Sequence, residues 1–282
     1  MSRFDAGRRL VKRGLSALGL EIRRVRPSAE SGARAYSNFG EDDLIRGWLG
    51  KLSPRHRYAV DIGAGDGETM SNTYGLFREG WEGLAAEWDG GKFARMAYRY
   101  SPLAGVRLAR VRVTPDNVLG LLAAAEAPRE FGFLSLDIDS YDHFVLERLL
   151  EAYRPALICA EINEKIPPPL KFTVKWDPDH RWAQDHFFGQ SLAMLDALGS
   201  RCGYALVGLE YNNAFLAARE LDPAPPLTAE TAYRTGYVDR PDRLRRLPWN
   251  ADMDPLLSMD PDQARAFVRE KFRAYEGRYI LE

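Results

Sequence analysis

The chain has 282 residues, of which 45% are hydrophobic and 28% are charged, a composition that excludes a disordered chain. Its 39 Lys and Arg residues are balanced by 40 Asp and Glu, which gives a formal net charge of −1. This balance argues against a nucleic-acid partner, and the lack of an apolar run of about 18 residues argues against a membrane-spanning helix.

The N-terminal segment is basic. Residues 1–26 contain eight Lys and Arg residues, and Val11, Leu15, Leu18 and Ile22 recur at helical spacing. A basic amphipathic helix can bind an anionic membrane surface, which would place the protein at the inner face of the membrane. The alternatives are a helix packed on its own domain or a frayed tail. We treat residues 1–35 as an N-terminal extension.

Two features bear on the cellular compartment. Cys159 and Cys202 both lie in apolar runs, so we expect no disulfide framework and favour a reducing cytoplasm. The N-terminus has no unbroken apolar stretch, so we do not interpret it as a secretory signal. The expected location is therefore cytoplasmic.

From residue 58 onward, short apolar segments alternate with helix-like stretches, the pattern of a doubly wound α/β sheet. The predicted strands are 58–62, 84–88, 107–113, 132–136, 156–161, 204–210 and 213–218. Only Tyr211 and Asn212 separate the last two, which permits a hairpin but no parallel crossover. We predict a mostly parallel, Rossmann-like sheet with one antiparallel strand near its end.

The C-terminal part carries the signals of one further helix. Asp260 and Gln263 stand at the N-cap and N3 positions of a capping box, and Gly277 is placed to end the helix. Apolar residues recur on one face of this helix, so we expect it to dock. We therefore predict a main domain over residues 36–220, with residues 221–282 as a loop and helical extension packed on it.

The segment VDIGAGDGET follows the first predicted strand and holds Gly63, Gly65 and Gly67 at G-x-G-x-G spacing. Glycine lets the backbone turn sharply and approach a ligand without a Cβ atom in the way. A dinucleotide-binding fingerprint would need its third glycine at position 68, which is Glu68. Together with Asp61, the pattern D-x-G-x-G-x-G resembles that of class I S-adenosylmethionine (SAM) methyltransferases.

An acidic residue stands where a nucleotide ribose could be bound. Glu87 ends the second predicted strand, 20 residues after Gly67, and a carboxylate there can accept both ribose hydroxyls. The alternative is a glycine-rich turn that only closes a βα unit. The resemblance implies SAM as the cofactor. The residues that we expect to form its site are Asn38, Asp61, Gly63, Ala64, Gly65, Asn72, Glu87, Trp88, Thr114 and Asp137.

A wider resemblance covers residues 36–220. The segments YSNFGEDDLI, GETMSNTYGLFREGWEGLAAE, FLSLDIDSYDHFVLERL and AEIN, followed by a final helix and hairpin, resemble the FkbM-type branch of methyltransferases in order and spacing. Asn38, Ser140, Tyr141 and His143 depart from that pattern. The resemblance implies a SAM-dependent O-methyltransferase that acts on a small-molecule or glycan acceptor, such as a sugar or another hydroxylated natural product. The oligomeric state stays open.

Carboxylates follow two neighbouring strands of the predicted sheet. Asp137 and Asp139 end the fourth strand, and Glu161 and Asn163 follow the fifth, at the edge where such sheets bind ligands. Oxygen ligands suit Mg²⁺ or Mn²⁺. The layout resembles the metal site of catechol and caffeoyl-CoA O-methyltransferases, which implies Asp137, Glu161 and Asn163 as ligands. Those enzymes have the last two adjacent, whereas Ile162 separates them here.

A mechanism without metal needs a general base, because the pKa of a sugar hydroxyl is far above 7. The candidate catalytic residues are Asp137, Asp139 and His143, with Asp142 as a further rival. A metal-free methyltransferase and a SAM-fold binding protein that has lost its activity are both kept as alternatives.

Residues 173–188 interrupt the alternation of strands and helices. The segment is aromatic, with Trp176, Trp182, Phe187 and Phe188. These rings could stack on a sugar, or they could form the core of a lid. The sequence leaves both interpretations open.

Overall fold

The central sheet has the strand order β3-β2-β1-β4-β5-β8-β7 in the computed structural model, which describes residues 35–282 apart from residue 224. The strands are β1 (Tyr58–Ile62), β2 (Glu82–Glu87), β3 (Val106–Arg110), β4 (Glu130–Leu136), β5 (Arg154–Glu161), β7 (Tyr204–Glu210) and β8 (Asn213–Ala218). Neighbours from β3 to β5 are parallel, and β8 is antiparallel to both β5 and β7. The predicted fold class is confirmed. The predictions for residues 1–26 lie outside the described residues.

Strand β3 ends three residues earlier than predicted. It pairs only with β2, and the ladder stops where Glu87, the last residue of β2, is opposite Arg110. Residues 111–113 therefore leave the sheet and become part of the loop at its carboxyl edge.

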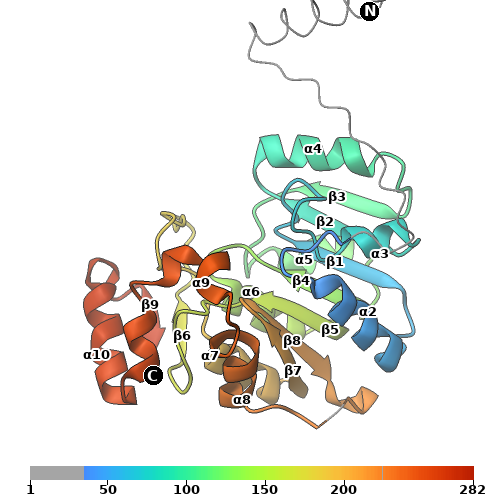
Figure 1. The fold of residues 1–282 in the computed structure, drawn as a ribbon. Coiled ribbons are helices and arrows are strands. Elements are labelled where there is room, and N and C mark those ends of the chain that lie inside the picture. Colours follow the sequence, from blue (N-terminus) through green and yellow to red (C-terminus); the bar gives the residue numbers. More distant parts are fainter. Residues whose placement is uncertain (1–34, 224) are drawn as a thin grey trace, which may run out of the picture. The chain divides into compact units, whose positions relative to one another are not determined.

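Helices cover both faces of the sheet (Figure 1). One face packs against α2 (Glu41–Leu52), α3 (Tyr74–Arg78) and α4 (Gly90–Tyr100). The other packs against α5 (Val118–Ala124), α6 (Asp142–Leu150), α7 (Leu192–Arg201) and α8 (Ala229–Tyr233). Successive strand residues point to opposite faces, so Ala59 enters one core and Val60 the other. Because both cores are apolar, the central strands are apolar throughout.

The C-terminal segment forms a second, smaller sheet that the sequence did not predict. In it β6 (Phe172–Val174) pairs antiparallel with β9 (Tyr279–Leu281). The predicted helix is present as α10 (Pro261–Lys271), with both hydrogen bonds of the capping box at Asp260. It ends before Gly277, because a 3-10 turn (Arg273–Tyr275) follows it. Figure 1 shows α10 and β9 beside β6. This segment therefore packs against the chain around β6.

Short helical turns connect β8 to β9. They are α9 (Arg243–Arg246), a π-helical turn (Arg234–Val238) and the 3-10 turns Arg219–Leu221, Pro248–Asn250, Asp254–Ser258 and Arg273–Tyr275. None of the helices within the described residues is long and apolar enough to cross a bilayer. Cys159 and Cys202 are both free thiols.

Candidate functional site

The glycine loop after β1 packs closely against the backbone of Asp137 and the side chain of Tyr100. A Cβ atom on Gly63 would lie 1.7 Å from the carbonyl oxygen of Asp137, and one on Gly67 would lie 2.7 Å from the Tyr100 ring. Gly65 faces open space, but its φ of +58° is a left-handed conformation that favours glycine. All three glycines are therefore required, two by packing and by conformation and one by conformation alone.

We expect Gly63→Ala to destabilise the protein by about 1–3 kcal/mol, because the new methyl group would displace the backbone at Asp137. Urea unfolding of the variant measures this loss. Gly120→Ala is the matched control, because Gly120 lies in α5 with open space around it, and alanine favours a helix. Equal free energies of unfolding for the wild type and Gly63→Ala would contradict the packing seen here.

Glu87 joins the glycine loop to the end of β2. Its side chain is 4% exposed, and its two carboxylate oxygens accept hydrogen bonds from the backbone N–H groups of Gly65 (2.9 Å) and Asp89 (2.7 Å). Each oxygen keeps a further lone pair for a ligand. With Gly63 and Trp88, Glu87 lines a cavity of about 520 Å³, which we call the first cavity.

The other walls of the first cavity come from loops at the carboxyl edge of the sheet. They are residues 111–113, 138–141, 180–182 and 184, with Lys92 on α4. Of the predicted cofactor residues, Gly63, Glu87 and Trp88 belong to this lining. The others lie outside it: Asn38, Asp61, Ala64, Gly65, Asn72, Thr114 and Asp137.

Three of these outlying residues have other partners. Asp61 is buried beneath the glycine loop and accepts a hydrogen bond from Thr73; burial raises its pKa to about 6. The Asn72 amide nitrogen lies 3.5 Å from both Ser135 and Cys159. Thr114 donates its backbone N–H to the side chain of Asn117. These contacts are with other parts of the protein, so the three residues have structural partners outside the first cavity.

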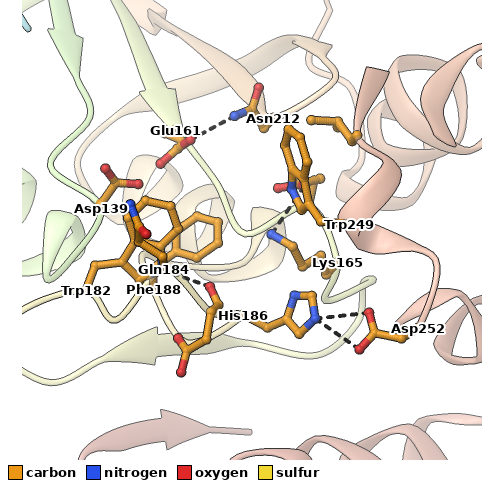
Figure 2. Close-up of a pocket in the computed structure, with 13 residues that line it drawn as sticks. Asp139, Glu161, Lys165, Trp182, Gln184, His186, Phe188, Asn212, Trp249 and Asp252 are labelled. Carbon is orange, nitrogen blue, oxygen red and sulfur yellow. Dashed lines mark hydrogen bonds and ion pairs between the residues drawn. The ribbon is translucent and has the colours of Figure 1, made fainter. Parts of the chain in front are cut away.

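A second cavity, of about 610 Å³, adjoins the first. Asp139, Trp182 and Gln184 line both, so these three residues stand between the two cavities. Figure 2 shows the second cavity, with Trp182 and Trp249 on opposite sides of it. Its carboxyl-edge wall includes Glu161, whose Oε1 accepts a hydrogen bond from the amide of Asn212 (2.8 Å).

Three carboxylates meet at the boundary of the cavities. Asp137, Asp139 and Glu161 each offer one oxygen atom, and these atoms all lie within 4.8 Å of one another. Asp139 has a left-handed φ of +54°, which is uncommon outside glycine. Asp142 stabilises that turn by accepting the backbone N–H groups of the residues on either side of Asp139, at 2.9 Å each. The turn after β4 therefore directs Asp139 toward Glu161.

The three carboxylates repel one another, so keeping all of them ionised costs free energy unless a positive charge lies nearby. Partial burial raises the pKa of Asp139 and Glu161, and the repulsion from neighbouring carboxylates raises both further. Asp137 is the more exposed member of the cluster. Lys92 and Lys165 oppose the shift at Asp139. Opposite ligands of a bound Mg²⁺ stand about 4.2 Å apart, so the oxygen spacing suits a divalent cation. The cluster can therefore hold either shared protons or a cation.

The three carboxylates that the structure brings together are Asp137, Asp139 and Glu161, so Asp139 joins two of the predicted metal ligands. Strand β5 ends at Glu161, so Asn163 lies beyond the strand. Asn163 is fully buried, and its amide nitrogen donates to the carbonyl oxygens of His186 (2.8 Å) and Phe188 (3.1 Å). This amide therefore supports the loop at residues 186–188.

His143 lies in α6 and lines neither cavity. It is 6% exposed, and its Nδ1 is 3.1 Å from Oε1 of Gln190. Burial lowers its pKa, so the ring is neutral near pH 7. This placement makes His143 a packing residue beside Gln190, and of the candidate bases only Asp139 lines the cavities.

The aromatic residues of the segment 173–188 divide between a packed core and the cavities. Phe187 is buried and stacks on Tyr275 at 3.9 Å, and Trp176 packs edge-on against Tyr141 at 4.3 Å. These rings form a core. Trp182, which is 38% exposed, instead faces both cavities.

Several residues of the site carried no recognisable signal in the sequence. Trp249 is 59% exposed in the second cavity and comes from a region outside the resemblance. Lys165 is 4% exposed, with its Nζ 3.4 Å from Glu164 and 4.3 Å from the centre of the Phe188 ring. The sequence indicated Asn212 only as a residue of the link between the last two strands, with no sign of a role in the site. Tertiary packing alone brings them to the cavity.

No protein-family model and no curated protein matches the chain. Among solved structures, it is similar to the N-terminal domain of EvdMO1 in the presence of SAH and D-fucose (15% identity, 75% of this chain and 96% of that one, TM-score 0.43). It is also similar to magnesium protoporphyrin IX methyltransferase (ChlM) from Synechocystis PCC 6803 (9%, 62% and 75%, 0.41). A third match is a SAM-dependent methyltransferase from Clostridium acetobutylicum (8%, 66% and 92%, 0.41). These scores are low, and the fold assignment rests on the strand order.

Proposed function

We propose that this protein is a SAM-dependent O-methyltransferase of the FkbM type, which transfers a methyl group to a hydroxyl of a sugar, a glycan or another hydroxylated natural product. One observation carries the proposal: two adjoining cavities at the carboxyl edge of the sheet share Asp139. Gly63 of the glycine loop and Glu87 line the first cavity, and the carboxylate of Glu161 lines the second. Doubly wound sheets bind their ligands at this edge.

The first cavity suits SAM. Its volume of about 520 Å³ falls in the range of small-molecule sites. Gly63 keeps the wall free of a side chain, and the remaining lone pairs of Glu87 can accept the two ribose hydroxyls. Trp88, which is 58% exposed next to Glu87, offers a flat surface for the adenine ring. When bound, SAM supplies a methyl group on a positively charged sulfur.

The second cavity suits a hydroxylated ring. Trp182 and Trp249 present exposed aromatic surface from opposite sides (Figure 2), which can pack on the apolar faces of a sugar. Lys165 and Asn212 add hydrogen-bond donors beside the carboxylates. A few polar groups in an aromatic cavity are what orients such a ligand.

The carboxylate cluster can handle the hydroxyl proton. Asp137, Asp139 and Glu161 would hold Mg²⁺ or Mn²⁺, and a cation there lowers the pKa of a bound hydroxyl. Asn212 fixes Glu161, and the turn after β4 fixes Asp139. In the metal-free alternative, Asp139 itself accepts the proton, since it lines both cavities and its pKa is raised.

Calorimetric titration of the purified protein with S-adenosylhomocysteine (SAH), before and after EDTA treatment, tests the proposal. We expect saturable binding of one SAH per chain in both states, because Glu87, the proposed ribose-binding residue, is not one of the three clustered carboxylates. Methyl transfer from labelled SAM to a panel of sugars then separates an enzyme from an inactive SAM-binding protein. A wild-type protein that binds no SAH would contradict the proposed function.

A further inference from the structure

Residues 175–189 form a closed loop that contributes to both cavities, and we call it the cavity loop. At its base, Thr173 forms an antiparallel bridge with Gln190, and the N–H of Val174 donates to the carbonyl of Gly189 (3.0 Å). Its ends are therefore held together, as in an Ω-loop. Residues 180–182 and 184 line the first cavity, and the second is lined by Trp182, residues 184–186 and Phe188.

One side chain from the segment that follows β3 holds the cavity loop. Arg112 follows β3 and lines the first cavity. Its two terminal nitrogens donate to the carbonyl oxygens of Pro178 and of His180 (2.5 Å for the latter). Its guanidinium carbon lies 5.4 Å from the centre of the Tyr141 ring, which belongs to the same lining. Within the described part of the chain no carboxylate forms an ion pair with Arg112, and its terminal nitrogens donate to the two loop carbonyls.

We infer that Arg112 is a positioning residue whose anchor on the cavity loop sets the affinity for SAM. The inference rests on the proposed function for the identity of the cofactor. His180, Arg181 and Trp182 supply one wall of the first cavity, and they lie next to the two anchored carbonyl groups. Without the anchor, residues 180–182 would take up their place in the wall in only a fraction of the molecules. The observed affinity would fall in proportion, because only that fraction is competent to bind the ligand.

The C-terminal segment holds the same loop from its other side. The Tyr275 hydroxyl donates to Oδ2 of Asp185, and Arg278 lies 3.3 Å from Asp177. Tyr275 lines neither cavity. A change at Tyr275 therefore loosens the cavity loop without removing a contact to a ligand, which separates positioning from direct binding.

The first arm of the experiment measures SAH binding by calorimetry. We expect Arg112→Met to weaken SAH binding at least tenfold and Arg112→Lys to weaken it less, because an ammonium can still bond one carbonyl. Arg129→Met is the matched control: Arg129 also donates to a main-chain carbonyl (Ala152, 3.1 Å) and lies 4.8 Å from a tyrosine ring, but it lines neither cavity. Wild-type affinity in Arg112→Met would overturn the inference.

The second arm measures hydrogen exchange in residues 179–185 without ligand. We expect faster exchange in Arg112→Met and in Tyr275→Phe, with exchange in the central strands unchanged, and about threefold weaker SAH binding in Tyr275→Phe. A Tyr275→Phe protein with a loosened loop and wild-type SAH affinity would overturn the coupling. If the wild type binds no SAH, the proposed function fails, while unaltered exchange in Arg112→Met would separately refute the anchor.

Discussion

Glu87→Gln should weaken SAM binding about tenfold or more while leaving the protein folded. Hydrogen bonds from the ribose hydroxyls to a carboxylate are worth about 1.5–3 kcal/mol, and 1.4 kcal/mol is a factor of ten in affinity. The structure adds a second reason. A glutamine amide would place its NH₂ group against the N–H of either Gly65 or Asp89, both of which now donate to the carboxylate. The substitution therefore disturbs the glycine loop as well as the ligand.

Calorimetric titration with SAH measures the change. Glu82→Gln is the matched control, since Glu82 is the first residue of the same strand and is exposed at the opposite end from the cavity. Circular dichroism shows whether both variants fold. If Glu87→Gln binds SAH as tightly as the wild type, Glu87 does not hold the ribose.

The sequence predicted the features that depend on local chain properties. The strands 58–62, 204–210 and 213–218 were predicted with the bounds that the structure has, because apolar runs end at turn residues. The glycine loop was recognisable because its conformation demands residues without a Cβ atom. The capping box of α10 is also a local signal, and it marked the start of the helix correctly.

The features that the sequence did not predict depend on contacts between distant segments. Strands β6 and β9 have three residues each, too few for a periodic pattern, and they pair with each other from distant parts of the chain. The course of the chain after β5 is another such feature: the N–H of Ile162 still pairs with Asn212, whereas that of Asn163 pairs with Gln190. The place of Asp139 in the cluster follows from its left-handed backbone conformation. The sequence gives no sign of that conformation, because the residue is not glycine.

The second large effect is expected at the carboxylate cluster: Glu161→Gln should lower the rate of methyl transfer about a hundredfold or more. Its Oε1 can still accept the hydrogen bond from Asn212, so the shape of the wall is kept and one negative charge is lost. A cation site that loses one of three carboxylates holds Mg²⁺ or Mn²⁺ weakly, and a cation contributes several kcal/mol to such a reaction. Glu161 lines only the second cavity of the two, so SAH affinity should stay unchanged.

Titration with Mn²⁺, followed by electron paramagnetic resonance, gives a readout that is independent of activity. Glu164→Gln is the matched control, because Glu164 lines the same cavity but bonds to Asn250 and lies outside the cluster, so this variant should retain Mn²⁺.

Under the metal mechanism, EDTA stops turnover of the wild type and Mg²⁺ restores it. Under the base mechanism, EDTA has no effect, Glu161→Gln is mild and Asp139→Asn is the severe change. Full turnover after exhaustive chelation would remove the cation from the mechanism, and Asp139, which faces both cavities, would then have to accept the proton itself.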